Sequence, residues 1–174
     1  MDADGLYFIK DEYFVDFPDD KLMTNKEIIN GQAHNRPCYY AFKDDVTGLY
    51  WLIPISSQIS KFEAIYNSKI EKYRICDTIV FAYVLGDKKA FLIQNMCPVT
   101  DEYINNQYIN SNTDSPVTIN PKAAHEIKNK AKKILILYRK RGINLILPNV
   151  FEIEKKLLIK QNLSQVAATK NMHI

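Results

Sequence analysis

The chain has 174 residues, of which 47% are hydrophobic and 25% charged. This composition is typical of a soluble globular protein and excludes the low-hydrophobicity class of disordered chains. The length predicts one domain, residues 1–174, with a sizeable core. No run of about 18 apolar residues is present and the N-terminus is acidic, which argues against a membrane span or a signal peptide and predicts a cytoplasmic protein.

The net charge of +3 is unevenly distributed along the chain. Residues 1–20 contain seven acids and one base, Lys10, whereas residues 121–141 contain eight bases and one acid, Glu126. Such segregation predicts one face that attracts a polyanion and another that repels it. The candidate nucleic-acid-binding bases are Lys122, Lys128, Lys132, Lys133 and Arg139.

Short apolar runs bounded by turn residues predict the strands of an antiparallel sheet. Gly48 and the Gly86-Asp87 pair supply turns for two hairpins, over residues 39–54 and 78–96. In chain order, the predicted strands are Leu6–Ile9, Tyr39–Lys43, Leu49–Pro54, Thr78–Val84 and Ala90–Met96.

Three segments are predicted to be helical. Ser60–Arg74 has apolar residues at helical spacing, and Ser60 with Glu63 has the form of a capping box. Residues 121–141 follow an Asn N-cap, begin with Pro and stop at Gly142. Val150–Lys160 is the last predicted helix, with a frayed tail from about residue 162.

Residues 104–118 are rich in Asn and Ser and form the longest predicted loop. Strands that mostly precede the helices favour an α+β fold, built on an antiparallel sheet.

The sequence lacks the motifs of nucleotide and metal enzymes. Cys38, Cys76 and Cys97 are widely spaced, so we expect buried thiols and neither a zinc site nor a disulfide. Three histidines are too few for a histidine metal cage, and no cofactor or metal is expected. Any reaction must therefore use polar side chains.

The densest polar cluster lies at the two outer ends of the first predicted hairpin. His34 and Arg36 precede its first strand, and Ser56, Ser57 and Lys61 follow its second strand. A hairpin brings its outer ends together, so these side chains are expected to converge. Cleavage of RNA by its own 2′-hydroxyl needs a proton acceptor, donors for the phosphorane charge and a proton donor for the leaving oxygen. The candidate catalytic residues are Ser57, Ser56, Lys61, Arg36 and His34.

Three segments together resemble the ToxN/AbiQ family of type III toxin–antitoxin endoribonucleases, most closely its CptN branch. They are Arg36-Pro37-Cys38-Tyr39, Tyr50-Trp51-Leu52-Ile53-Pro54-Ile55-Ser56-Ser57 and Phe91-Leu92-Ile93-Gln94-Asn95-Met96-Cys97-Pro98-Val99-Thr100. Each motif alone is weak, whereas their order and spacing are fairly specific. The resemblance covers about residues 5–150.

The resemblance implies a compact, twisted antiparallel sheet with surrounding helices, similar to the MazF/Kid-like toxins. It implies metal-independent cleavage of cellular or phage RNA that leaves a 2′,3′-cyclic phosphate, in the service of phage resistance by abortive infection. It also implies a small repeated non-coding RNA antitoxin, folded as a pseudoknot, which the toxin cuts from its precursor and with which it forms a closed hetero-oligomer.

The resemblance supports some of the candidate catalytic residues more strongly than others. The family's hydroxyl pair matches Ser56 and Ser57, and Ser57 is the strongest candidate. The lysine that follows this pair in ToxN has its nearest counterpart in Lys61, at a longer spacing. The family's tyrosine and lysine around the first hairpin are replaced by His34 and Cys38, so proton transfer is assigned to His34 or Arg36.

Each candidate also has a structural interpretation. The serines are good N-caps, Lys61 and His34 fit a solvated surface, and Arg36 could pair with Asp44 or Asp45. The basic helix could serve solubility alone. The alternative functions are a non-catalytic RNA-binding module and a protein–protein adaptor.

Overall fold

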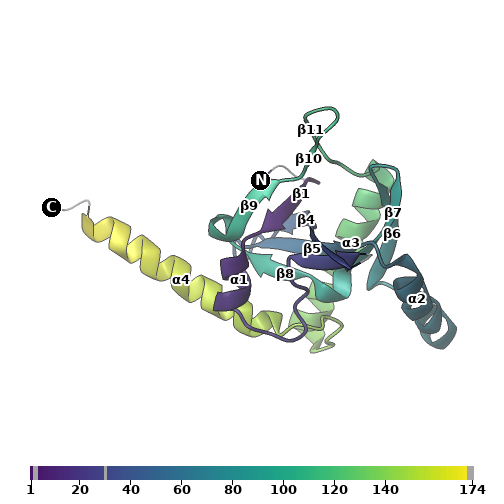
Figure 1. The fold of residues 1–174 in the computed structure, drawn as a ribbon. Coiled ribbons are helices and arrows are strands. Elements are labelled where there is room, and N and C mark those ends of the chain that lie inside the picture. Colours follow the sequence, from purple (N-terminus) through teal and green to yellow (C-terminus); the bar gives the residue numbers. More distant parts are fainter. Residues whose placement is uncertain (2–3, 30, 172–174) are drawn as a thin grey trace.

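The computed structural model describes residues 1, 4–29 and 31–171. Within them, a seven-stranded antiparallel sheet has the order β6-β7-β5-β4-β1-β9, and β8 pairs with the other half of β5 (Figure 1). The strands are β1 (Leu6–Ile9), β4 (Cys38–Lys43), β5 (Tyr50–Ser56), β6 (Ile79–Val84), β7 (Asp87–Leu92), β8 (Cys97–Val99) and β9 (Ile104–Gln107). The predicted α+β class with an antiparallel sheet is confirmed.

Helices cover both faces of this sheet. They are α1 (Asp11–Asp16), α2 (Ile59–Tyr73), α3 (Pro121–Arg141) and α4 (Val150–Asn171). Helix α3 packs on one face, α1 and the first half of α4 pack on the other, and α2 lies beside β6 and β7 (Figure 1). The second half of α4 projects away from the body (Figure 1).

The central strand β5 is apolar on both sides because it lies between two layers of the core. Trp51 and Ile53 join the cluster under α3, whereas Leu52 joins the cluster under α1 and α4. A strand buried on both faces has a continuous apolar run instead of alternation. In β4, a register shift between Tyr40 and Phe42 places Ala41 and Phe42 together on the α3 side.

Helix α3 has the bounds predicted from its sequence. The Asn120 side chain accepts a hydrogen bond from the Lys122 backbone N–H at 2.9 Å, and Gly142 ends the helix with φ of 64°. Its buried stripe consists of Ala124, Ile127, Ala131, Ile134 and Leu135. Local signals suffice here because caps and apolar periodicity agree.

Both predicted hairpins are confirmed. Tyr39 pairs with Ile53 in one, and Ile79 pairs with Leu92 in the other. The second turn is one residue earlier than predicted, since Leu85 and Gly86 hold the positive φ angles of a two-residue turn, 51° and 87°.

The strand predicted over Ala90–Met96 is wrong in extent. Strand β7 begins at Asp87 and ends at Leu92, and a 3-10 turn, η1 (Ile93–Asn95), separates it from β8. This turn lets one stretch of chain pair first with the end of β5 and then with its beginning.

Three other local predictions are wrong. The capping box is absent, because the N-cap of α2 is Gln58 and Glu63 instead forms an ion pair with Lys88 at 2.6 Å. The predicted loop over 104–118 instead contains β9 and a small hairpin of β10 (Ile109–Asn110) with β11 (Ser115–Pro116). The 3-10 turn η2 (Asp101–Tyr103) comes directly before this segment. The last helix continues past Lys160 to Asn171, and residues 172–174 of the predicted tail lie outside the described residues.

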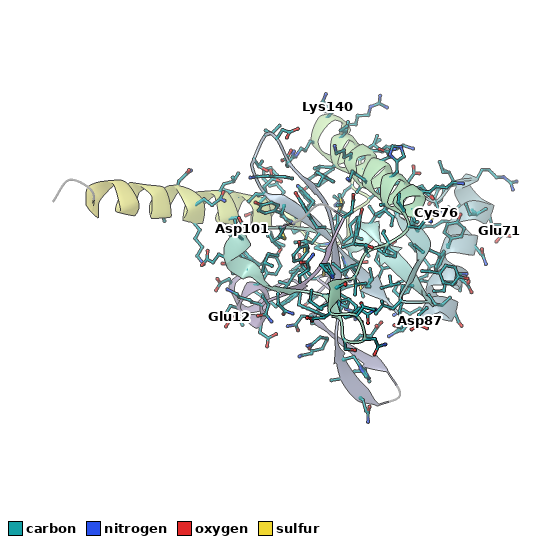
Figure 2. All side chains as sticks on the ribbon, turned by 90° about the horizontal axis from the view of Figure 1, so that it is seen from above. Glu12, Glu71, Cys76, Asp87, Asp101 and Lys140 are labelled. Atoms are coloured by element: carbon teal, nitrogen blue, oxygen red, sulfur yellow. The ribbon has the colours of Figure 1, made fainter. Side chains whose placement is uncertain are left out.

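Sequence analysis also missed α1 and a polar hairpin, β2 (Lys26–Ile29) with β3 (Gln32–Asn35). This hairpin projects from one side of the molecule, near Glu12 and Asp87 and far from Lys140 at the end of α3 (Figure 2). Its strands lack an apolar alternation, so periodicity could not reveal them. In the described part of the chain, no helix is both long and apolar enough to cross a membrane.

Candidate active site

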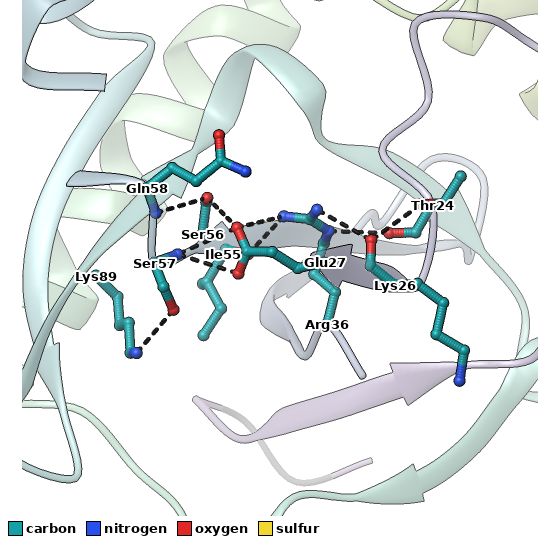
Figure 3. Close-up of polar contacts among 9 residues, drawn as sticks. All are labelled: Thr24, Lys26, Glu27, Arg36, Ile55, Ser56, Ser57, Gln58 and Lys89. Atoms are coloured by element: carbon teal, nitrogen blue, oxygen red, sulfur yellow. Dashed lines mark hydrogen bonds and ion pairs between the residues drawn. The ribbon is translucent and has the colours of Figure 1, made fainter. Parts of the chain in front are cut away.

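A buried carboxylate, Glu27, lies where the β2–β3 hairpin meets the end of β5. It is 6% exposed and accepts hydrogen bonds from the Ser56 hydroxyl and from the Ser57 backbone N–H, the latter 3.2 Å from Oε2 (Figure 3). Arg36 Nη1 lies 3.5 Å from Oε1 and compensates its charge. Sequence analysis missed Glu27, since a lone acid in a polar segment has no distinguishing pattern.

Arg36 fastens this hairpin to the sheet. It is 6% exposed, and each of its three guanidinium nitrogens donates a hydrogen bond within the protein (Figure 3). Nε bonds to Thr24 O at 2.9 Å, Nη1 to Ile55 O at 3.1 Å and Nη2 to Lys26 O at 3.2 Å. The structure therefore places this predicted catalytic residue behind the site, where it positions Glu27 and β5.

The two neighbouring serines occupy different environments. Ser56 is 1% exposed, and its hydroxyl donates to Glu27 while accepting from the Gln58 N–H at 3.2 Å. Ser57 is half-buried, and its Oγ accepts a hydrogen bond from Lys89 Nζ at 2.8 Å (Figure 3). Ser56 is thus held in the interior network, whereas Ser57 faces a cavity.

Strand pairing explains why Lys89 reaches Ser57. Strand β7 pairs with the end of β5 so that Ala90 lies opposite Ser56, which places Lys89 opposite Ser57. Lys89 also lies 3.5 Å from Asp87. Sequence analysis missed Lys89, because two predicted hairpins do not reveal which of their strands are neighbours.

A cavity of about 220 Å³ opens at these residues. His34 reaches it from β3, where it lies directly opposite Glu27 in the antiparallel register. The cavity is lined by Glu27, His34, Asn35, Pro37, Ile55, Ser57, Val84, Leu85, Asp87, Lys89 and Tyr108. An imidazole, an ammonium and a hydroxyl therefore share one recess, a set that can transfer a proton and hold a phosphate.

Lys61 is not brought to this recess. It is an exposed residue in the first turn of α2, with its Nζ 5.5 Å from the centre of the Phe62 ring, and it is absent from the cavity lining. Of the five predicted catalytic residues, the structure brings Ser57 and His34 into the cavity and places Ser56 and Arg36 in the buried network beneath it.

The predicted separation between an acidic N-terminus and the basic helix is wrong in one place. Asp4 forms an ion pair with Lys128 at 3.1 Å. Lys133 pairs with Asp77 at 2.5 Å, so acids from distant parts of the chain neutralise bases of α3. The ratio of eight bases to one acid within α3 therefore overstates the positive charge that this helix presents to solvent.

Arg139 is held by two carboxylates, Asp44 and Glu154, each 2.8 Å from Nη2. Burial by itself raises the pKa of Asp44, but the hydrogen bond from Arg139 lowers it, and the pKa stays below its usual value. Lys122 and Lys132, by contrast, are exposed and have no ion pair in the described part of the chain. Among the five predicted nucleic-acid-binding residues, these two remain available to a phosphate.

All three cysteines are free and buried, as predicted. Burial raises the pKa of the Cys97 thiol to about 12, so it stays protonated and inert at neutral pH. The described side chains include no group of three His, Cys, Asp or Glu residues that could hold a metal ion.

The fold and the recess together define an α+β protein with a polar, lysine-containing cavity at one end of its central strand. No known family and no curated protein matches the chain by sequence. Its fold is similar to that of AbiQ, a lactococcal anti-phage endoribonuclease belonging to the type III toxin–antitoxin system, with a TM-score of 0.61 and 14% identity. The similarity covers 91% of this chain and 98% of AbiQ. The fold that the sequence resemblance implied is thereby confirmed.

Proposed function

We propose that the chain is a sequence-selective endoribonuclease, the toxin of a type III toxin–antitoxin system. The observation that carries this proposal is the contact of 2.8 Å between Lys89 Nζ and Ser57 Oγ, inside a cavity that His34 also lines. Support comes from the fold, which the chain shares with AbiQ over nearly the whole length of both proteins.

The reaction is cleavage by the RNA's own 2′-hydroxyl. The 2′-oxygen attacks the adjacent phosphorus, its proton passes to a base, and the bond from phosphorus to the 5′-oxygen breaks. The products are a 2′,3′-cyclic phosphate and a 5′-hydroxyl end, which takes up a proton. His34 is the proton-transfer group of the cavity, because an imidazole ring can both accept and donate a proton through its nitrogens. None of these steps requires a metal.

Ser57 and Lys89 stabilise the charge that develops on the phosphate. Because the Ser57 oxygen accepts from Lys89, its own proton is free to be donated to a phosphate oxygen. The Lys89 ammonium adds a positive charge that is most valuable in the transition state. Glu27 and Arg36 act as positioning residues, since they hold the Ser57 backbone and the His34 hairpin against β5.

The inhibitor is a small repeated non-coding RNA, folded as a pseudoknot and cut from its precursor by the same site. Toxin and RNA assemble into a closed hetero-oligomer in the cytoplasm, and the substrates are cellular or phage RNA. Lys122 and Lys132 contact the antitoxin phosphates, since both are exposed and neither has an ion pair in the described structure. The bases of α3 that already form ion pairs with acids of the protein contribute less to antitoxin binding.

The test is incubation of the purified protein with mixed RNA in the presence of EDTA. Fragments with cyclic-phosphate ends are expected from the wild type, whereas Ser57→Ala should yield almost none. RNA that is bound but remains intact would favour the alternative, a non-catalytic RNA-binding module. A requirement for added divalent metal would contradict the proposed mechanism.

A further inference from the structure

A second cavity, of about 270 Å³, lies between the turn of the β4–β5 hairpin and the second half of α3. We call it the α3 recess, and it is lined by residues 42–46 together with Lys132, Leu135, Ile136, Arg139 and Lys140. It shares no lining residue with the candidate active site. Figure 2 shows Lys140 at the end of α3, far from Asp87, which lines the active-site cavity. The two cavities are therefore separate sites.

The centre of the α3 recess is apolar and partly open to solvent. Phe42 and Leu135 form its buried part. Two aliphatic side chains, Val46 from the hairpin turn and Ile136 from α3, are 85% and 52% exposed. Because both line the same cavity, they extend the apolar surface of Phe42 outwards. An apolar surface within a recess is typical of a contact site.

Three exposed lysines surround this apolar centre: Lys43 from β4, and Lys132 and Lys140 from α3. Within the described part of the chain, none of them forms an ion pair or a hydrogen bond. Lys132 Nζ instead lies 5.6 Å from the centre of the Phe42 ring. Ile136 is four residues from both Lys132 and Lys140, so these three side chains are neighbours on one face of α3. Ammonium groups therefore lie on both sides of an exposed apolar residue.

The acids of the recess offset little of this positive charge. Asp44 is 8% exposed, and its carboxylate accepts hydrogen bonds from Arg139 Nη2 at 2.8 Å and from the Thr47 hydroxyl at 2.6 Å. The charge of Asp44 is thus already compensated inside the protein. Asp45 is exposed and has no ion pair among the described residues. One unpaired acid therefore stands against three unpaired lysines.

A ligand of the α3 recess must combine negative charge with an apolar group. An unpaired RNA nucleotide does so, since its phosphates can lie on ammonium groups and its base can lie against aromatic and aliphatic side chains. Lys132 is also one of the two lysines proposed above to contact the antitoxin phosphates. The antitoxin strand would therefore pass the rim of the recess. A short substrate held at Ser57, in the separate active-site cavity, need not reach it.

We infer that the α3 recess is a second docking site for the RNA antitoxin, which takes up one unpaired base of that RNA. This inference rests on the proposed function. The base lies against Val46 and Ile136, and the neighbouring phosphates lie at Lys132 and Lys140. Antitoxin and substrate compete for one active site, so a contact that only the antitoxin makes lets it bind more tightly than the substrate does.

The experiment uses the full chain and the RNA that copurifies with it when the gene is expressed together with the DNA upstream of it. This RNA is sequenced, transcribed in vitro and used in binding measurements with the double variant Val46→Gln/Ile136→Gln. Both positions are exposed and glutamine is neutral, so neither damage to the core nor charge repulsion enters the comparison. Ile159→Gln, at a 51% exposed position of α4, is the matched control.

The double variant should bind the antitoxin RNA about tenfold more weakly than the wild type and the control do, as expected for the loss of one base contact. Its cleavage of a short RNA should be unchanged. Abasic substitution along the antitoxin should reveal one unpaired position that costs the wild type about tenfold in affinity and costs the double variant almost nothing. Such coupling would show that this base and the recess contact each other.

The other outcomes separate the docking site from the proposed function. Equal affinity of the wild type and the double variant would overturn the docking site and leave the apolar surface to a protein partner. An equal loss of affinity in Ile159→Gln, a loss without any coupled base, or slower cleavage of the short RNA by the double variant would also overturn it. In each of these cases, cleavage by the wild type leaves the ribonuclease function standing. Absence of both cleavage and copurifying RNA would overturn the proposed function, and the docking site with it.

Discussion

Ser57→Ala and Ser56→Ala are expected to have opposite consequences, although the two residues are neighbours in the sequence. The Ser57 hydroxyl lies in the cavity, bonded to Lys89, with its proton available to a phosphate oxygen. The Ser56 hydroxyl lies in the interior, where it joins Glu27 to the Gln58 N–H. One change removes a group that acts on substrate, and the other removes a group that holds the fold.

The magnitudes follow from these environments. Loss of one donor to the transition state costs about 2–4 kcal/mol, so Ser57→Ala should lower kcat by roughly 10²- to 10³-fold. Its stability should fall by less than about 1 kcal/mol, because water can reach the half-buried position. Ser56→Ala leaves buried polar groups without a partner and should cost about 1–3 kcal/mol. For a chain of this size, that loss lowers Tm by about 2–12 °C.

The assay is single-turnover cleavage of an end-labelled RNA, measured well below the Tm of every variant, together with thermal unfolding followed by circular dichroism. Ser56→Ala should keep most of its cleavage rate there, and Ser68→Ala, at an exposed position of α2, serves as the control for both readouts. A Ser57→Ala protein that cleaves within about threefold of the wild-type rate would refute the assignment, since that corresponds to less than 1 kcal/mol. Equal losses of rate in both serine variants would refute the distinction between them.

Three other experiments test other parts of the structure. Lys89→Met should slow cleavage without lowering Tm by more than a few degrees, because the residue is only partly buried; an unchanged rate would remove it from the site. Lys132→Ala should weaken RNA binding and reduce the salt slope by about 0.7, whereas Lys133→Ala should change it less because Asp77 already neutralises that base; equal slopes would show that pairing does not matter. The pKa of Asp44 is lowered in the folded state, so its contribution to the free energy of unfolding is present above the unfolded pKa of about 3.9 and is lost as the pH falls through the folded value. Urea unfolding at a series of pH values should therefore show a shallower acid loss in Asp44→Asn than in the wild type.

Local signals in the sequence were enough for the elements that depend on neighbouring residues. The Asn cap, the following Pro and the closing Gly142 predicted both ends of α3. The turns at Gly48 and Gly86 predicted two hairpins, because the chain that enters each turn pairs with the chain that leaves it. The hairpin also correctly brought His34 near Ser57, two residues on which the proposed reaction depends.

Other features are set by contacts between segments that are distant in the sequence. Lys89 meets Ser57 because β7 pairs with β5, and Glu27 meets Ser56 because the polar hairpin folds onto the end of that strand. The count of charges along α3 predicted a basic nucleic-acid-binding helix, but Asp77 and other acids from elsewhere in the chain neutralise several of its bases. Periodicity, caps and turns act over a few residues, so they determined the helices and hairpins of this protein. Which side chains meet at the cavity depends on strand order and packing, and these were decided only when the whole core formed.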